Sequence, residues 1–384
     1  MNKINHLVYV NILKPIFFRF DPEDVHERMT KLGIFLGKHY LARKLIHTMF
    51  FYSNKKLSQN ILGINFQNPI GLSAGFDKNA VLTDILPHIG FGFAEVGSIT
   101  GEKCEGNPKP RLWRLKKSKS LAVYYGLKND GSDAISKRLK NKKFIMPIGI
   151  SIAKTNCMET VDVNNGIADY VKAYKNFAGI GDYDTINISC PNTYGGEPFT
   201  NPDNLDKLLT EIDKIKSDKV KSDRIKSDNI KLNMKKSKPL FLKISPDLTD
   251  DNIDKLIEIV KKHKVDGFVC TNLTKKRDNK RIIDENVPEK GGLSGKVVEE
   301  QSNKLIKYIF KKTKGRYVII GVGGVFTAED AYKKIKSGAS LIQLITGMIY
   351  EGPQVISEIN IGLVKLLEKD GYSNISEAVG KGAN

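Results

Sequence analysis

The 384-residue sequence lacks any apolar run long enough to cross a lipid bilayer. A spanning helix needs about 18 or more consecutive apolar residues, but Lys14, Pro15, Arg19 and Lys31 interrupt the apolar segments before residue 60. The same region has neither the apolar core length nor the small-residue cleavage site of a secretory signal. The sequence therefore predicts neither a spanning helix nor a cleaved signal.

Cysteine is also scarce. The four cysteines, Cys104, Cys157, Cys190 and Cys270, form no C-x-x-C pair and have no histidine cluster near them. This spacing indicates neither a disulfide framework nor a zinc site, and it fits a reducing compartment. We expect no bound metal.

Acidic residues are too few to balance the basic ones: 43 Asp and Glu stand against 62 Lys and Arg, a formal net charge of +19. Such an excess fits nucleic acid, an anionic membrane or acidic ligands as partners. No basic segment is interleaved with the aromatic residues that stack on bases. Lys is also abundant together with Asn and Ile, as in nucleotide-biased coding sequences. We interpret most of the charge as solvated surface and expect no nucleic-acid partner.

Residues 1–60 form an amphipathic segment in which Leu and Phe alternate with Lys and Arg. Asp21-Pro22-Glu23-Asp24 is typical of a helix start, with an N-cap, a proline at the first helical position and acids in the first turn. Helices of this kind suit a membrane surface, and they equally suit packing on the body of the protein. The pattern alone leaves both interpretations open.

Beyond residue 60, short apolar runs alternate with longer amphipathic segments. Near-continuous apolar strands separated by helices favour parallel pairing, and eight of them close a (β/α)8 barrel. The length allows either two domains or one such barrel with an extension. We predict an α/β fold with a (β/α)8 TIM barrel at residues 61–384 and an N-terminal helical extension at residues 1–60. The eight predicted strands are 69–75, 93–99, 147–152, 185–189, 240–245, 267–272, 318–324 and 341–346.

The segment 214–238 interrupts this pattern, because Lys-Ser-Asp recurs at residues 216, 221 and 226. A period of five matches neither a helix nor a strand, and the segment is polar and rich in charge. We predict a disordered, low-complexity surface insertion whose removal leaves activity intact.

The predicted strand 185–189 leads directly to Cys190, which lies between Asn187 and Asn192. Pro191 forces the chain out of the strand, and active sites of (β/α)8 barrels lie at the carboxyl ends of their strands. The thiol there can act as a base or nucleophile with amide hydrogen-bonding groups beside it. A buried cysteine that merely packs is the alternative.

Glycine-rich turns follow the predicted strands six, seven and eight, at residues 291–295, 321–324 and 346–347. In barrels such turns allow backbone N–H groups to approach a phosphate. Lys243 and Lys78 lie at the ends of strands five and one, where a buried lysine requires an anion or an electron-rich ring; a salt bridge from Lys78 to Asp77 is the alternative. Together these groups predict a flavin mononucleotide (FMN) site beside a small anionic substrate.

The sequence resembles the dihydroorotate dehydrogenases, and among them the membrane-associated, quinone-reducing class. The resemblance covers nearly the whole chain, and its most specific motifs are AGFDK at 74–78, PRLWRL at 110–115, NISCPNT at 187–193, GGLSG at 291–295 and IGVGG at 320–324. It implies FMN-dependent oxidation of dihydroorotate to orotate in pyrimidine synthesis. In that reaction, Cys190 would remove the C5 proton while hydride passes from C6 to flavin N5, and Lys243 would stabilise the reduced flavin.

The resemblance also implies the residues that contact each group. Substrate contacts would come from Lys78, Gly126, Leu127, Asn192 and Asn272. The flavin would be bound by Ala74, Gly75, Ser98, Ser151, Asn187, Lys243, Thr271, Ser294, Gly295, Gly323, Gly324 and Thr346.

Four positions depart from the family pattern. Cys190 replaces the serine base usual in the quinone-reducing class, and a thiol with a pKa near ~8.5 is a better base at neutral pH than a hydroxyl. Val123 stands where an asparagine usually binds the substrate, Ile345 where a tyrosine is common, and Ser151 where an asparagine is usual. A divergent FMN barrel with another cyclic substrate or a soluble electron acceptor is therefore the alternative function.

In the quinone-reducing class the N-terminal extension forms an apolar tunnel to the flavin, and Arg114 matches the arginine of the quinone site. The resemblance thus implies a quinone as electron acceptor. It also favours membrane-surface attachment of residues 1–60, on the cytoplasmic face.

Overall fold

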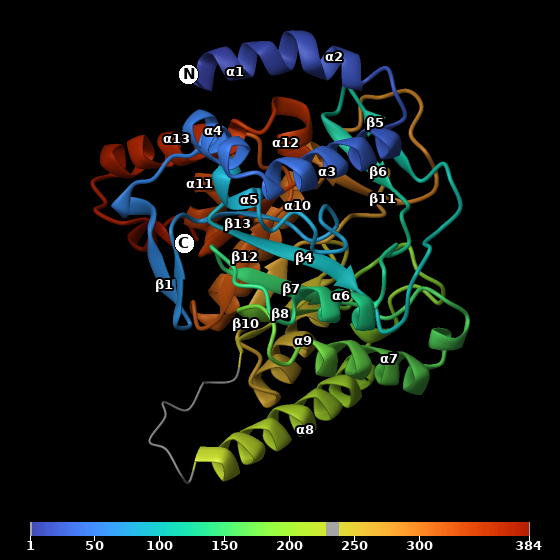
Figure 1. The fold of residues 1–384 in the computed structure, drawn as a ribbon. Helices are drawn as coiled ribbons and strands as arrows, with labels where there is room; N and C mark the ends of the chain where they lie inside the picture. Colours follow the sequence, from blue (N-terminus) through green and yellow to red (C-terminus); the bar gives the residue numbers. More distant parts are fainter. Residues whose placement is uncertain (1, 228–237, 384) are drawn as a thin grey trace.

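The computed structural model describes residues 2–227 and 238–383, and its centre is a closed barrel of eight parallel strands (Figure 1). Every neighbouring pair in the barrel is parallel. All eight predicted strands are confirmed, with ends shifted by a few residues. They are β3 (Ile70–Leu72), β4 (Phe93–Ile99), β7 (Ile148–Ile152), β8 (Tyr183–Asn187), β9 (Leu240–Ile244), β10 (Gly267–Cys270), β12 (Val318–Val322) and β13 (Leu341–Leu344).

The barrel interior is filled by a packed apolar core toward the amino ends of its strands. Phe93, Tyr183 and Phe241 point inward from β4, β8 and β9 and pack with Val269, Ile320 and Leu341. A short hairpin, β1 (Gln59–Ile61) and β2 (Ile64–Phe66), adds Phe66 to this cluster. Inward side chains in layers are the usual filling of such a barrel, so the open space lies at the carboxyl ends of the strands.

Helices cover the outside of the barrel through their apolar faces. Two of these helices begin with a threonine cap: Thr249 accepts from the backbone N–H of Asn252, and Thr327 forms a capping box with Asp330. The helices that follow the extension are α5 (Leu86–Ile89), α6 (Ser132–Leu139), α7 (Val163–Asn176), α8 (Pro202–Ser227), α9 (Asp250–Lys262), α10 (Glu299–Thr313), α11 (Ala328–Ser337), α12 (Thr346–Glu351) and α13 (Val355–Asp370).

The prediction of disorder over residues 214–238 is wrong as far as Ser227, because α8 continues to that residue. Leu205, Leu208, Leu209 and Ile212 are buried at helical spacing in the first turns of α8. Once a packed segment has nucleated a helix, each further residue adds with little cost, even in a polar sequence. The rest of the predicted insertion, 228–237, lies outside the described residues.

A small antiparallel sheet lies beside the barrel mouth, formed by β5 (Leu112–Leu115), β6 (Ser120–Val123) and β11 (Gly292–Gly295) in the order β11-β6-β5. We expected a glycine-rich turn at 291–295, and this is wrong for residues 292–295. Leu293 pairs with Ala122, and its side chain packs in a cluster with Leu115 and Val297. Local glycine content predicted a turn, whereas pairing with β6 makes the segment a strand.

The N-terminal extension is helical, as predicted, and its helices gather over one end of the barrel, with α8 on the opposite side of the molecule (Figure 1). Its elements are α1 (Asn2–Val8), a π-helical turn (Tyr9–Leu13), α2 (Lys14–Phe17), α3 (Pro22–Lys38) and α4 (Tyr40–Phe50). Asp21 caps α3 by accepting from the N–H groups of Glu23 and Asp24. Within the described ranges, no helix is both long and apolar enough to span a membrane.

A buried ion pair attaches the extension to the barrel. Arg111 donates to both carboxylate oxygens of Glu23 on α3, at 2.8 Å from Nη2 and 3.0 Å from Nε, and both side chains are almost fully buried. The same guanidinium donates to the carbonyl oxygens of Glu105 and Asn107. Arg111 therefore fixes α3 against the loop that precedes β5.

Candidate active site

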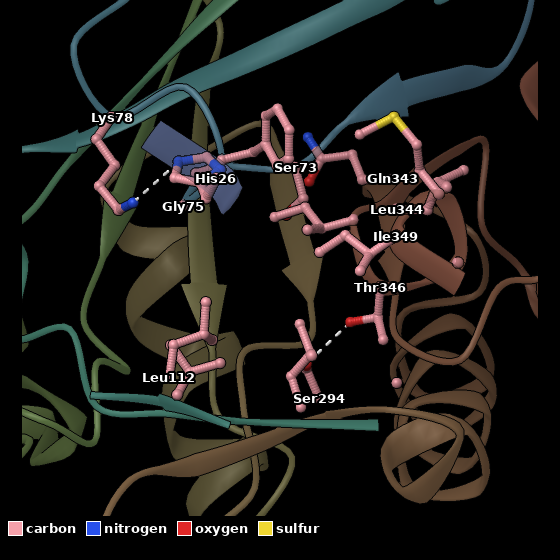
Figure 2. A pocket seen from close by; sticks show the side chains of 18 of the residues that line it. His26, Ser73, Gly75, Lys78, Leu112, Ser294, Gln343, Leu344, Thr346 and Ile349 are labelled. Carbon is pink, nitrogen blue, oxygen red and sulfur yellow. Dashed lines mark hydrogen bonds between the residues drawn. The ribbon is translucent and has the colours of Figure 1, made fainter. Parts of the chain in front are cut away.

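One cavity of about 540 Å³ occupies the barrel mouth and extends under the N-terminal helices (Figure 2). The structure brings into its wall every predicted site residue except Ser151. The lining residues among them are Ala74, Gly75, Lys78, Ser98, Arg114, Gly126, Leu127, Asn187, Cys190, Asn192, Lys243, Thr271, Asn272, Ser294, Gly295, Gly323, Gly324 and Thr346. Ser151 is fully buried behind this wall, and its hydroxyl lies 2.7 Å from that of Ser98.

Hydrogen-bonding groups form the floor of the cavity at the ends of β4, β8 and β9. Asn187 donates from Nδ2 to Ser98 Oγ at 2.9 Å, and its carbonyl oxygen accepts from Tyr170. Lys243 pairs with Asn187 in the strand register and is 4% exposed. Burial lowers the pKa of Lys243, and the neighbouring Glu95 carboxylate opposes that shift. This floor offers donors to the polar edge of a flat heterocycle.

A second set of donors lies at the ends of β12 and β13. Gly323 and Gly324 have φ angles of +113° and +72°, which favour glycine, and a side chain at Gly324 would collide with Glu299. Beside them the hydroxyls of Ser294 and Thr346 lie 2.9 Å apart (Figure 2). Backbone N–H groups without side chains and two hydroxyls suit a phosphate group. The donor set therefore fits a phosphorylated heterocycle, with the ring on the cavity floor and the phosphate beside Gly323 and Gly324.

Amides surround the space between this floor and the small sheet. Asn272 donates from Nδ2 to the Ser189 carbonyl oxygen at 2.7 Å, and Asn192 donates to the Val123 carbonyl oxygen at 2.8 Å. Val123 itself contributes an apolar side chain and a backbone acceptor to this wall. A small planar molecule bound here would meet several amide groups, but no side-chain donor at position 123.

Lys78 makes no salt bridge to Asp77, whose carboxylate accepts instead from the N–H groups of Val81 and Leu82. The Lys78 ammonium lies 3.8 Å from the Tyr125 ring centroid and 3.4 Å from Nε2 of His26 on α3 (Figure 2). Burial lowers the pKa of Lys78 to about 8. Burial and the Lys78 charge lower the pKa of His26 to about 3, so the imidazole is neutral at pH 7. The lysine remains available for an anionic ligand.

Cys190 lies three residues beyond β8, half-buried in the cavity wall. Burial raises the pKa of its thiol to about 11. The backbone N–H of Asn192 and the Lys154 charge act in the opposite direction, while Glu197 adds to the increase. The expectation of a thiol with a pKa near 8.5 is therefore wrong, because burial of the sulfur in the cavity wall depends on the folded structure and not on the local sequence.

The part of the cavity under the extension is apolar. Leu32, Leu36 and Phe50 from α3 and α4 line it together with Ile345 and Met348. Arg114 is a polar exception: it donates to the Phe20 carbonyl oxygen at 2.8 Å, and its guanidinium carbon lies 4.6 Å from the Phe18 ring centroid. An apolar molecule can thus approach the polar floor from the side of the N-terminal helices.

Sequence reasoning missed several groups in or under the cavity. His26 and Tyr125 contact Lys78, and no local pattern connects residues so distant in sequence. Glu95 and Gln343 were more accessible to prediction, because each is a polar residue inside an otherwise apolar predicted strand. Both are fully buried in the barrel, and Gln343 also lines the cavity.

Comparison with known proteins gives a consistent result. Residues 56–367 match the family model described as dihydroorotate dehydrogenase. Dihydroorotate dehydrogenase (quinone) of Trichodesmium erythraeum is 35% identical over 392 residues, covering 97% of this chain and 98% of that protein. The enzyme of the same name from Haloarcula marismortui is 36% identical, covering 96% and 98%. Among solved structures, the Eimeria tenella DHODH in complex with ferulenol superposes with a TM-score of 0.81 at 32% identity, covering 94% of this chain and 95% of that one.

Proposed function

The chain belongs to the dihydroorotate dehydrogenase family, and from this premise we propose how its cavity carries out the reaction. The protein is a flavin-dependent oxidoreductase that oxidises dihydroorotate to orotate in pyrimidine synthesis and passes the electrons to a quinone. One observation supports the roles proposed below: a single cavity joins the polar floor of the barrel mouth to the apolar space under the N-terminal helices.

The flavin in this proposal is FMN, with its ring against Asn187, Lys243 and Ser98 and its phosphate against the donor set of Gly323, Gly324, Ser294 and Thr346. The remaining contacts come from Ala74, Gly75, Thr271 and Gly295, with Ser151 supporting Ser98 from behind. A flavin held by these residues would supply hydride-accepting chemistry to the substrate and electron transfer to the quinone. Lys243 supplies a fixed positive charge at the ring, which stabilises negative charge that develops there.

Dihydroorotate binds on the amide side of the cavity in this proposal. Lys78 attracts its carboxylate, Asn192 and Asn272 hydrogen-bond the pyrimidine ring, and Gly126 and Leu127 complete the wall. Cys190 acts as the general base: its thiolate takes the C5 proton and becomes a thiol. The proximity of the thiol to this group of amides supports its role, and the raised pKa requires that the thiolate be a minor form at neutral pH.

An anaerobic titration tests this function. Dihydroorotate added to the yellow protein without oxygen is expected to bleach the flavin, and a short-chain quinone is expected to restore the colour. Fumarate and a nicotinamide should not restore it. Lack of bleaching would point to a different cyclic substrate, and reoxidation by fumarate or a nicotinamide in place of quinone would contradict the acceptor.

We also propose that the N-terminal extension attaches the protein to a membrane surface, on the cytoplasmic face. Among the described residues, thirteen of the nineteen exposed large apolar side chains lie between Ile4 and Leu45, although these helices are a small part of the chain. Basic residues such as Arg28, Lys31 and Lys44 lie on the same helices. Apolar and cationic groups together suit the interface of an anionic bilayer, from which a lipid-soluble quinone could enter the cavity.

Exchange of two exposed leucines tests the attachment. Leu41 and Leu45 on α4 are 77% and 62% exposed, so L41D/L45D should fold normally. Burial of a leucine in apolar surroundings stabilises by about 1.5–3 kcal/mol, so vesicle partitioning should fall at least about 100-fold while activity with a short-chain quinone is retained. The matched control is I145D, at a similarly exposed position (64%) outside the extension. Equal partitioning of the two variants would contradict attachment through α4.

A further inference from the structure

A polar layer lies inside the barrel, between the apolar cluster around Phe93 and the cavity, and two of its members, Lys243 and Gln343, also line the cavity. Glu95 from β4, Thr185 from β8, Lys243 from β9 and Gln343 from β13 are all at most 4% exposed. One Glu95 oxygen, Oε2, accepts from Thr185 Oγ1 at 3.0 Å and from Gln343 Nε2 at 3.2 Å. Two neutral donors therefore fix the orientation of a carboxylate in the interior.

The other Glu95 oxygen faces Lys243. Oε1 lies 3.8 Å from Lys243 Nζ and has no hydrogen-bond partner within the described part of the chain. The same ammonium donates to Ser73 Oγ at 3.3 Å. A buried carboxylate without a counter-charge is costly, and the geometry gives Glu95 its counter-charge at the lysine that forms the floor of the cofactor site.

We propose that Glu95 is a positioning residue for Lys243, which fixes the ammonium at the floor of the flavin site and keeps it protonated. The inference rests on the proposed function in one respect, namely that Lys243 contacts the flavin ring. A protonated Lys243 stabilises the reduced flavin, and a neutral one does not. Glu95 thereby sets the pH range in which this stabilisation operates.

Among the described residues, two titratable groups act on the charge of Lys243. Glu95 faces it from β4 and Cys190 from the loop after β8, while Tyr183 on β8 lies close to Glu95. Burial lowers the pKa of Lys243, and Glu95 is the larger of the two opposing influences. Removal of the Glu95 charge should therefore allow Lys243 to lose its proton at a lower pH than in the parent protein.

The test is the midpoint potential of the bound flavin between pH 6 and pH 10, measured by spectroelectrochemical titration of E95Q, K243M and the parent holoenzyme. In E95Q the potential should acquire an additional pH-dependent step that is absent from the parent. Across this step the reduced flavin becomes tenfold less stable per pH unit, about 30 mV per unit for a two-electron couple. T185V, which removes one hydrogen bond to Glu95 but keeps its charge, is the control and should follow the parent.

Each outcome separates the inference from the proposed function. If K243M leaves the potential of the parent unchanged, Lys243 does not act on the flavin and the proposed function loses that contact. If K243M shifts the potential but E95Q keeps the pH dependence of the parent, the role of Glu95 is refuted. Should E95Q fail to bind flavin, E95Q/K243M is expected to unfold at a higher urea concentration than E95Q, because neither charge is then left unpaired. Equal stability of the two variants would also refute the ion pair.

Discussion

The pH dependence of flavin reduction provides a direct test of Cys190 as the base. Its pKa of about 11 means that about one protein molecule in 10⁴ carries the thiolate at pH 7, which is about 300-fold fewer than for an unperturbed thiol near 8.5. The rate constant of anaerobic flavin bleaching at saturating dihydroorotate should therefore rise tenfold per pH unit from pH 6.5 and level off near pH 11.

Substrate affinity should follow a different group. The pKa of Lys78 is about 8, so this lysine is charged below that pH and neutral above it. Its attraction for the dihydroorotate carboxylate is present at low pH and lost above about pH 8. In stopped-flow measurements, the dissociation constant should thus rise above pH 8 while the limiting rate constant continues to increase.

Removal of the thiol completes this test. Cys190→Ala should lower the limiting rate constant by about 10²- to 10⁴-fold, the usual contribution of a positioned base, and abolish its dependence on pH. Bleaching of Cys190→Ala as fast as the parent would refute the role of the thiol. A parent profile that levels off near pH 8 would instead refute the effect of burial on its pKa.

Three further predictions concern the rest of the chain. Glu23→Gln should reduce the free energy of unfolding by about 3–5 kcal/mol in urea at pH 7, because Arg111 is left buried without its partner. Burial acts to raise the pKa of Glu23, but the hydrogen bonds and charge of Arg111 outweigh it, so the net pKa is lowered. The stabilisation by this ion pair is therefore fully present above the unfolded-state pKa of about 4.3, and it should be lost as the pH falls through the lowered folded-state pKa. Val123→Asn should lower the KM for dihydroorotate by about 2- to 13-fold and leave the quinone KM unchanged, since a new neutral hydrogen bond is worth about 0.5–1.5 kcal/mol. An unchanged dihydroorotate KM would show that position 123 does not contact the substrate. Replacement of residues 228–237 by a short Gly-Ser linker should leave turnover intact, and a folded but inactive product would assign this segment a function.

Much of the fold followed from local patterns. The strands of this barrel are buried on both faces, so each reads as an apolar run that sequence alone reveals, and Asp21-Pro22 marks the start of α3 through the backbone groups it satisfies. The errors have a physical cause as well. Residues 292–295 became a strand through pairing with β6, and α8 extends into the Lys-Ser-Asp segment from a packed start.

For the site, the sequence by itself determined which residues lie at the carboxyl ends of the strands, because a parallel barrel brings all of those ends to one rim. Eighteen of the nineteen predicted site residues line one cavity, including those on or beside the small sheet that only the family resemblance implied: Arg114, Gly126, Leu127, Ser294 and Gly295. Only the tertiary structure decided how those groups behave. The approach of α3 gives Lys78 a neutral imidazole in place of an acid, burial in the cavity wall raises the pKa of the Cys190 thiol, and Glu95 meets Lys243 across the barrel interior. Burial and charge at a point in space depend on segments far apart in the chain, and no local pattern records them.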